Sequence, residues 1–377
     1  MFKRVLPLLL VSSLFMATDV QAQWSDIELE FDGENRSYSM YIPSSYDADG
    51  ASALVLTLHG LGDTKENFRQ IGFAPIADTA NFIILVPQAL HDGMTGTAWN
   101  SRAGAFGIYP NTDIDDIGFF NAILDSTIAN YSVNLDRIYV CGYSMGGFMT
   151  ERLACEDNSR FAAFASVAGT MGNGLNGCNP GKAVPLAHFH GTADGTVGYD
   201  QNLFGISVDS LTNFWITNNS CDPTPVHTAL PDVANDGYTV DHYLYSGGNA
   251  DYELFKVNNA DHVWLRKPTN DIAYTEEIWK FFNRHTEALD IADLNMLDFA
   301  VYPNPTEDKI VISLEKLKKE EPVAISLYSI DGKELYNTKV QAENISLSLK
   351  ELGIKTGMYF VQISQGTLQK TTKIVVK

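Results

Sequence analysis

The segment Cys141-Gly142-Tyr143-Ser144-Met145-Gly146-Gly147, "CGYSMGG", indicates how the chain folds. It follows the apolar run "RIYV" and precedes "FMTERLACE", which has a helical pattern. Gly142 and Gly146 flank Ser144 in the G-x-S-x-G order, in which glycines allow a tight strand-to-helix turn that exposes the serine. A Gly-rich connection without chemistry could contain the same residues. The surrounding sequence therefore decides between a nucleophile and an ordinary turn.

Short apolar runs alternate with amphipathic segments over about 260 residues. Such runs are typical of strands that are buried on both faces of a parallel sheet, and they occupy residues 53–59, 82–87, 137–142, 162–169 and 185–191. Apolar residues at helical spacing predict helices at 116–131 and 271–285, with Asp115 or Asp116 as the N-cap of the first. Asp32-Gly33 indicates a hairpin turn near the start. The alternation predicts an α/β domain with a mainly parallel sheet.

Partners for Ser144 occur downstream in the order that an α/β-hydrolase requires. Asp194, in "HFHGTADGTV", follows the predicted strand 185–189, and His262, in "VNNADHVW", lies in a loop before the last helix. The other downstream histidines are worse placed, because His227 and His242 lie in or beside predicted strands and His285 ends a predicted helix. A serine hydroxyl needs a base and oxyanion donors before it is a good nucleophile. We therefore predict Ser144, His262 and Asp194 as nucleophile, base and acid.

Backbone N–H groups are expected to supply the oxyanion donors. The segment His59-Gly60-Leu61-Gly62 follows the strand "ALVLTL" and would bring an N–H beside the nucleophile. We predict the N–H groups of Leu61 and Met145 as donors, with those of Gly60 or Gly62 as alternatives to Leu61. His59 and His190 are interpreted as structural residues at strand ends. The mechanism needs no metal and no cofactor.

Several aromatic residues lie in loops that are expected near the active face. We predict substrate contacts for Trp99, Tyr199 and Trp264, since an aromatic-lined cleft suits phenolic acyl groups or sugar rings. The alternative for each is that the ring only packs. Trp264 is the best placed of the three, two residues after His262.

The N-terminus and the cysteines indicate an oxidising compartment. Lys3 and Arg4 precede an apolar run that is too short to span a bilayer, and a small-residue cleavage pattern predicts a signal peptide at 1–22. No other segment resembles a transmembrane helix. Four cysteines allow three two-bridge pairings, between which spacing does not choose. We favour one bridge, Cys178 to Cys221, with Cys141 as a free core thiol.

Charge divides the chain into two parts. Residues 300–377 contain 11 Lys and 9 Asp or Glu, about +2 net, whereas residues 1–299 carry about −22. So acidic a surface argues against nucleic acid as a partner. Short alternating strands after residue 300 predict an all-β sandwich. We predict a catalytic domain at 23–290, a linker at 291–299 and a small β domain at 300–377.

Residues of about 25–288 resemble the secreted esterases grouped with poly(3-hydroxybutyrate) depolymerases and with feruloyl or acetylxylan esterases, carbohydrate esterase family one. The shared motifs, in order, are "RSYSMYIP", "LTLHGLGDT", "VPQA", "WNSR", "DDIGF", "GYSMGG", "HGTADGTV" and "DHVW". The resemblance implies an α/β-hydrolase fold and the same roles for Ser144, Asp194 and His262. The family's "GGGH" before the base is "NNADH" here.

The tail from about residue 300 resembles the C-terminal sorting domain of type IX secretion substrates. It contains "YPNP", "SIDGKEL", "GMYFVQI" and the lysine-containing end "KIVVK". The resemblance implies the type IX machinery as a partner and export to the cell surface or beyond. The alternative is an accessory β-sandwich that binds polysaccharide.

These features leave several functions open. An esterase for feruloyl or acetyl groups of plant polysaccharide comes first, because no separate polymer-binding domain remains once the tail is interpreted as a sorting signal. Depolymerisation of an aliphatic or aromatic polyester comes second. The alternative of another class is a catalytically inactive surface-binding protein, which would usually have lost one of the three catalytic residues, whereas Ser144, Asp194 and His262 are all present.

Overall fold

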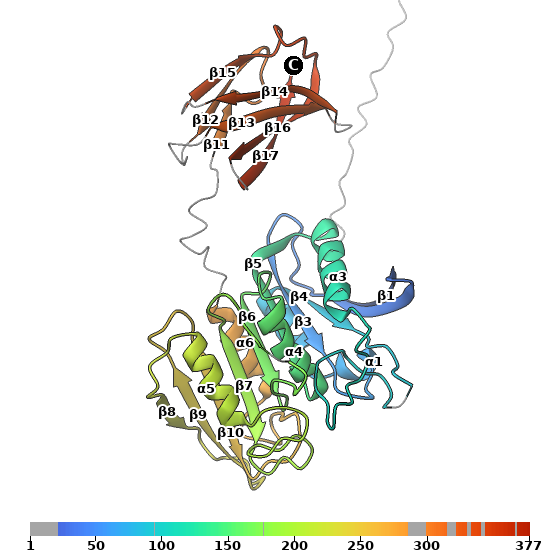
Figure 1. Cartoon of the computed structure of the whole chain (residues 1–377), viewed down its shortest axis with the longest axis vertical. Coiled ribbons are helices and arrows are strands. Elements are labelled where there is room, and N and C mark those ends of the chain that lie inside the picture. Colours follow the sequence, from blue (N-terminus) through green and yellow to red (C-terminus); the bar gives the residue numbers. More distant parts are fainter. Residues whose placement is uncertain are drawn as a thin grey trace, which may run out of the picture. The chain divides into compact units, whose positions relative to one another are not determined.

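The computed structural model describes residues 22–285, except 94 and 176, and residues 299–377, except 315–321, 330–332, 341–343 and 366–367. The chain forms two compact units, Met1–Ala288 and Leu289–Lys377 (Figure 1). The predicted signal peptide and nearly all of the predicted linker lie outside the described residues. Within the described part of the chain, no helix is both long and apolar enough to cross a membrane.

A mixed sheet runs through the first unit, and its middle strands are parallel. β4, β3, β5, β6, β7 and β10 pair in parallel, whereas the pairs at both edges are antiparallel. Within the described residues the strands, in sheet order, are β1 (Gln23–Phe31), β2 (Glu34–Ile42), β4 (Phe82–Pro87), β3 (Ser52–Leu58), β5 (Val133–Tyr143), β6 (Ala163–Val167), β7 (Leu186–Gly191), β10 (Tyr252–Asn258), β9 (Thr239–Tyr245) and β8 (Val226–Ala229).

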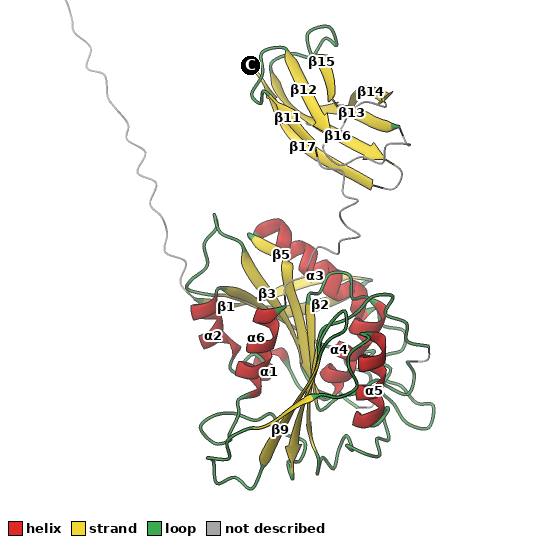
Figure 2. Ribbon diagram, turned by 90° about the vertical axis from the view of Figure 1, so that its left-hand side faces the viewer, coloured by secondary structure: helices red, strands yellow, loops and turns green. Residues whose placement is uncertain are grey.

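Helices cover both faces of this sheet (Figure 2). One core lies between the sheet and α3 (Asp116–Asn130), α4 (Met145–Glu156) and α5 (Val208–Asn218). The other lies between the sheet and α1 (Lys65–Phe68), α2 (Phe73–Ala80) and α6 (Tyr274–Arg284). Because successive strand residues point to opposite faces, Leu186 of β7 joins the first core and Ala187 joins the second.

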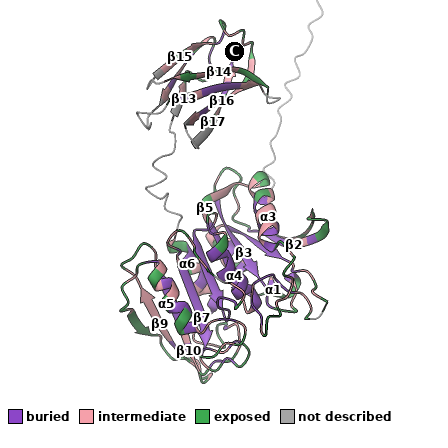
Figure 3. Ribbon diagram, viewed as in Figure 1, coloured by how far each residue is buried: buried purple, intermediate pink, exposed green. Residues whose placement is uncertain are grey.

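The unbroken apolar runs form strands for a simple reason. Every residue of β3, β4, β6 and β7 is buried, which is the environment that helices on both faces of a parallel sheet create (Figure 3). The Asp32-Gly33 hairpin joins β1 to β2, and the Asp115 carboxylate caps α3 by accepting the Gly118 N–H at 2.9 Å. The predicted fold class is confirmed.

The second unit consists of two antiparallel sheets. Its core residues alternate along several strands, for example Ile310 and Ile312, or Val361 and Ile363, so one face of these strands is buried. Within the described residues, one sheet contains β11 (Phe299–Tyr302), β12 (Lys309–Leu314) and β15 (Asn344–Ser348), and the other contains β14 (Glu334–Val340), β13 (Val323–Ser329), β16 (Gly357–Gln365) and β17 (Leu368–Val376).

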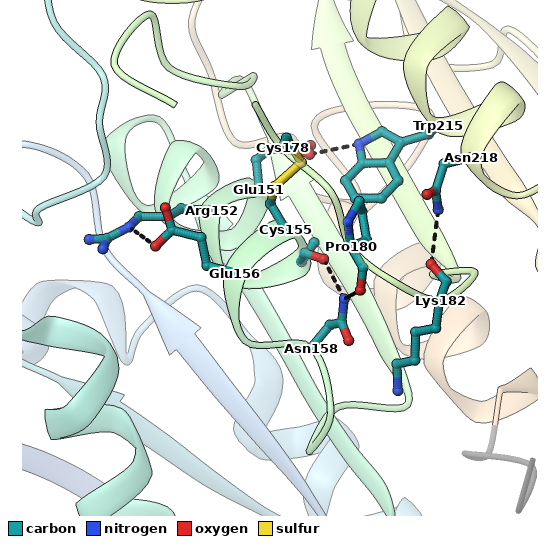
Figure 4. Close-up of a disulfide and its surroundings, with 11 residues drawn as sticks. Glu151, Arg152, Cys155, Glu156, Asn158, Cys178, Pro180, Lys182, Trp215 and Asn218 are labelled. Carbon is teal, nitrogen blue, oxygen red and sulfur yellow. Dashed lines mark hydrogen bonds and ion pairs between the residues drawn. A yellow bond between two sulfur atoms is a disulfide. The ribbon is translucent and has the colours of Figure 1, made fainter. Parts of the chain in front are cut away.

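The predicted disulfide is wrong. Cys178 pairs with Cys155, with 5.5 Å between their Cα atoms, and Cys221 is free (Figure 4). Cys155 lies in the last turn of α4, and the loop after β6 returns across this end of the helix, where Asn158 Nδ2 donates to the Pro180 carbonyl at 2.9 Å. The Cys221 thiol instead donates to the Ala250 carbonyl. Cys178 therefore pairs with Cys155 because the loop after β6 brings it to this end of α4.

A buried ion pair connects the start of the chain to α3. Arg36 of β2 donates to Asp116 Oδ1 at 2.7 Å, and both side chains are almost fully buried. The guanidinium also lies 4.0 Å from the centre of the Phe119 ring, and Asp116 Oδ2 accepts the Asn100 N–H at 2.7 Å. The pair therefore joins three motifs that are distant in sequence, "RSYSMYIP", "WNSR" and "DDIGF".

Breaking this pair is expected to destabilise the protein strongly. Asp116→Ala leaves the Arg36 charge buried without its partner, which costs about 3–5 kcal/mol of unfolding free energy. Asp115→Ala, at the neighbouring exposed N-cap, removes the same charge and should cost only about 1 kcal/mol. Urea unfolding of both variants measures the difference. Equal losses would mean that the buried pair contributes no more than the cap.

Candidate active site

Ser144 lies in a strained turn between β5 and α4. Its backbone has φ 54° and ψ −118°, a conformation that residues other than glycine rarely adopt. The Ser144 N–H donates to the Val167 carbonyl at 2.8 Å, and the Ser144 carbonyl accepts the Phe148 N–H at 3.0 Å. These bonds on both sides hold the turn and stabilise the strained residue.

The two glycines of the motif are required by close approach of the backbone. A Cβ on Gly142 would lie 2.1 Å from the Gly146 carbonyl oxygen, and a Cβ on Gly146 would lie 2.0 Å from that of Leu58. Gly169, after β6, is equally crowded, because its Cβ would lie 2.4 Å from the Ser144 carbonyl oxygen. Any side chain at these positions would push α4 away from the strand ends and move Ser144.

Three side chains form a continuous hydrogen-bonded series at the carboxyl ends of the parallel strands. His262, after β10, has Nε2 at 2.9 Å from Ser144 Oγ and Nδ1 at 2.7 Å from Asp194 Oδ2. Asp194 lies three residues beyond β7. Both distances are within hydrogen-bond reach, so the geometry suits proton transfer from Ser144 to an imidazole oriented by a carboxylate.

The Asp194 carboxylate is buried and well supplied with donors. Its Oδ1 accepts the N–H groups of Thr196 at 2.9 Å and Val197 at 2.8 Å. Burial alone would raise the pKa of Asp194, but hydrogen bonds from His190 and His262 outweigh it and hold this pKa well below its usual range. The Asp194 carboxylate is therefore charged at neutral pH.

The loop that carries His262 is held by residues that the sequence analysis did not single out. The Tyr143 hydroxyl donates to the His262 carbonyl at 2.9 Å, and the two rings lie 5.0 Å apart. Asp261 Oδ1 accepts the N–H groups of His262 and Gly195, and so joins the base loop to the acid loop. Tyr143 precedes Ser144, so the same turn positions nucleophile and base.

Two backbone N–H groups beside Ser144 are free to bind an oxyanion. Among the described residues, neither the Leu61 N–H nor the Met145 N–H has a hydrogen-bond acceptor. The Gly62 N–H, considered above as an alternative donor, is occupied by the Thr97 carbonyl at 2.8 Å. Gly60 lies close to the nucleophile, since a Cβ there would be 3.4 Å from Ser144 Cβ. The Gly60 N–H has no acceptor among the described residues either, so Leu61 with Met145 remains the prediction and Gly60 remains the alternative to Leu61.

His59 holds the loop at residues 59–62 in place through two hydrogen bonds. It is fully buried, its Nδ1 donates to the Gly60 carbonyl at 2.7 Å, and its Nε2 accepts the Ala89 N–H at 3.1 Å. Burial lowers the pKa of His59, which keeps the ring neutral in this tautomer. The interpretation of His59 as a structural residue agrees with these contacts.

Two of the three aromatic residues expected to contact substrate are core residues instead. Trp99 is fully buried, and its indole N–H donates to the His59 carbonyl at 2.8 Å. Tyr199 is buried, with its ring edge against His190. Both predictions are therefore wrong, because the loops fold back over the sheet and bury these rings. The sequence around a large aromatic residue in a loop is the same whether the ring packs in the core or contacts substrate.

Trp264 has a mixed environment. Its ring packs edge-on against Tyr143 and Phe68, and its indole N–H donates to Thr275 Oγ1 at 3.2 Å. The side chain stays partly exposed, unlike Trp99. Its contact with substrate remains a prediction.

Known proteins match both parts of the chain. Residues 45–220 match the phospholipase/carboxylesterase family, and residues 300–377 match the secretion system C-terminal sorting domain. Feruloyl esterase D of Neurospora crassa is 24% identical over 68% of this chain and 85% of its own length. The chain is a serine ester hydrolase of the α/β-hydrolase fold. Its sorting domain directs this hydrolase to the cell surface or the extracellular space.

Two further comparisons concern the hydrolase domain. The bifunctional acetylxylan esterase/xylanase XynS20E of Neocallimastix patriciarum is 28% identical over 67% of this chain, but the match spans only 34% of that longer protein. Among solved structures, a ferulic acid esterase of Anaeromyces mucronatus in complex with ferulic acid is 16% identical, with a TM-score of 0.47 over 71% of this chain and 92% of its own.

Proposed function

We propose that the protein hydrolyses feruloyl or acetyl esters of plant polysaccharide outside the cell, through an acyl-enzyme on Ser144. One observation carries the proposal: His262 joins Ser144 Oγ at 2.9 Å to Asp194 at 2.7 Å. An inactive binding protein would have no reason to keep a strained serine in hydrogen-bond contact with a base and an acid.

The chemistry follows from these contacts. Ser144 Oγ attacks the ester carbonyl carbon while His262 Nε2 takes the hydroxyl proton. Asp194 holds the His262 Nδ1–H and stabilises the imidazolium that forms. When the tetrahedral intermediate collapses, the bond to the leaving alcohol breaks and His262 returns the proton to that oxygen. Water, activated by His262 in the same way, then releases the carboxylic acid and restores Ser144.

Charge on the carbonyl oxygen develops next to the two free backbone donors. The N–H of Met145 belongs to the first turn of α4, where backbone donors have no intrahelical acceptor and the helix dipole is positive. The Leu61 N–H approaches from the loop after β3. Two preorganised donors of this kind stabilise the transition state more than the neutral substrate.

The substrate class is inferred from the relatives. The alignments with Feruloyl esterase D and the acetylxylan esterase/xylanase cover most of the hydrolase domain. Leu61 is exposed in the loop whose Gly60 approaches Ser144, so it offers apolar surface on the loop that adjoins the nucleophile. The C-terminal unit agrees with an extracellular polymer as substrate, since it matches a sorting domain, whose partner we propose to be the type IX secretion machinery.

Release of ferulate from methyl ferulate tests the substrate assignment. We expect release by the wild-type protein and about a million-fold slower release by the Ser144→Ala variant, both measured by chromatography of the free acid. A phenolic substrate predicts a higher kcat/KM for methyl ferulate than for p-nitrophenyl butyrate. Activity on p-nitrophenyl acetate and acetylated xylan without ferulate release would favour the acetyl ester. Activity only on aliphatic polyester would overturn the polysaccharide assignment, and no activity on any ester would overturn the proposal.

A further inference from the structure

A row of buried polar side chains lies behind the catalytic carboxylate, and the mechanism above does not use it. His188 and His190 project from the same face of β7 toward α4, and Glu151 lies on α4 seven residues after Ser144. All three side chains are fully buried. We call them the Glu151–His188–His190 chain. It ends at Asp194, since His190 Nε2 lies 3.4 Å from Asp194 Oδ2.

Acceptors at one end determine where the protons of the two histidines lie. His190 Nε2 lies 2.7 Å from the Val197 carbonyl, which only accepts, so Nε2 carries a hydrogen. In a neutral ring His190 Nδ1 is then an acceptor. His188 Nε2, 3.0 Å away, must donate to it. Burial lowers the pKa of His188 well below its usual range, so His188 is neutral and its Nδ1 is a bare acceptor.

The bare nitrogen of His188 faces Glu151. His188 Nδ1 and Glu151 Oε1 are 3.9 Å apart, and neither has a hydrogen-bond partner among the described residues. An ionised Glu151 would direct a second lone pair at Nδ1. A protonated Glu151 instead presents an O–H to it, and a shift of about 1 Å brings the atoms to hydrogen-bond distance. The other oxygen, Oε2, accepts the Trp215 indole N–H at 2.8 Å (Figure 4).

The surroundings of Glu151 also favour the neutral acid. Burial raises the pKa of Glu151 to about 8, although the Trp215 N–H and the Ser166 hydroxyl lower it. Among the described groups, Trp215 of α5, Ser166 of β6, Tyr252 of β10 and His188 of β7 face it, and none of them carries a positive charge at neutral pH. Among the described residues, no positive charge therefore offsets the cost of burying an ionised Glu151.

We propose that His190 is a positioning residue for Asp194, and that His188 and a protonated Glu151 fix the tautomer in which His190 donates toward it. The inference rests on the proposed triad. Through the Val197 carbonyl, His190 holds the turn whose Thr196 and Val197 N–H groups bind Asp194 Oδ1. The same N–H faces Oδ2, the oxygen that binds His262.

Two substitutions at position 190 test the donor. His190→Gln keeps an N–H near the place of Nε2, whereas His190→Phe keeps the ring volume without a donor. We expect His190→Phe to lower kcat by about 10- to 100-fold, the effect of losing a hydrogen bond to a charged group, with KM changed less than about twofold. The acid limb of its pH–rate profile should move to higher pH, because a less solvated Asp194 stabilises protonated His262 more. His190→Gln should retain kcat within about threefold.

Substitutions at position 151 test whether Glu151 is protonated and donates to His188. Glu151→Gln is neutral, donates an N–H toward His188 and accepts from Trp215, so it should have the kcat of the wild type. Glu151→Leu removes both functions and should lower kcat by about 10-fold or more. Above about pH 8 the wild type should lose activity as Glu151 ionises, whereas Glu151→Gln should keep its plateau.

Stability provides a readout that does not depend on catalysis. Because the pKa of Glu151 is raised on folding, the wild type loses stability as pH rises from the unfolded value, about 4.3, to about 8, and Glu151→Gln does not. The unfolding free energy of Glu151→Gln minus that of the wild type should therefore increase as pH rises across this range. If this difference in unfolding free energy does not change with pH, Glu151 is not protonated in the folded protein.

The outcomes separate this inference from the proposed function. Equal losses of kcat in His190→Phe and His190→Gln, with both folded, would overturn the positioning role. A wild type that is inert toward every ester tested, methyl ferulate and p-nitrophenyl acetate included, would overturn the proposed function, while the pH dependence of stability would still decide the state of Glu151. If His190→Phe does not fold, the Glu151→Gln pH profile decides, and an alkaline limb identical to that of the wild type contradicts the proposal.

Discussion

Replacing Ser144 with alanine is expected to lower kcat for ester hydrolysis by about a million-fold. The variant has no nucleophile to form an acyl-enzyme, whereas substrate binding and the Leu61 and Met145 donors remain. The residual rate should therefore still exceed that of water, by about 10³- to 10⁴-fold. Initial rates with p-nitrophenyl acetate measure the loss, and KM should change little. Stability should be unaffected, because within the described part of the chain the Ser144 side chain bonds only to His262.

A covalent probe gives an independent readout of the same prediction. A fluorophosphonate should add to Ser144 of the wild type, with the mass found on the peptide that contains "CGYSMGG", and should not add to Ser144→Ala. Ser210→Ala serves as the matched control, because Ser210 lies on α5, outside the triad, and its hydroxyl bonds to the capping Ser207. Retention of more than about a thousandth of the activity in Ser144→Ala would contradict the role of nucleophile.

Asp194→Asn is expected to lower kcat by about 10⁴-fold while leaving the fold intact. The asparagine oxygen can keep the bonds from Thr196 and Val197, so its NH₂ group must face His262 Nδ1. Two donors cannot face each other, so the His262 proton moves to Nε2. That nitrogen then meets Ser144 Oγ as a donor and can no longer accept its proton.

The matched control is Asp200→Asn, which makes the same charge change at an exposed position and should leave kcat within about twofold. Because the pKa of Asp194 is depressed on folding, its contribution to stability is present above the unfolded value, about 3.9, and is lost as pH falls through the lower folded value. The stability difference between wild type and Asp194→Asn should therefore shrink below about pH 4. A kcat loss under tenfold would contradict the role of Asp194.

Local chemistry made much of the fold and of the site predictable. The strands β3, β4 and β7 begin and end within about a residue of the apolar runs, because burial on both faces demands an unbroken apolar segment. The G-x-S-x-G motif indicated Ser144 for a similarly local reason, since only glycine tolerates contacts near 2 Å at positions 142 and 146. The order of Asp194 and His262 followed from the strands that precede them.

Long-range packing explains the predictions that failed. Trp99 and Tyr199 lie in loops, and nothing local distinguishes a ring that faces solvent from one covered by another loop. The partner of Cys178 depends on the loop after β6 crossing the end of α4, which the spacing of cysteines does not encode. Tyr143 and Asp261 hold the base loop through bonds between the ends of different strands.

The sequence by itself determined the elements, the parallel sheet and three chemically matched residues at strand ends, because each depends on composition and periodicity within a short window. Only the tertiary structure decided the disulfide, the burial of the aromatic residues and the Glu151–His188–His190 chain. Glu151 has the pattern of an ordinary helix residue. It meets His188 because α4 covers the face of the sheet to which His188 points, and packing there buries a carboxyl group beside a histidine.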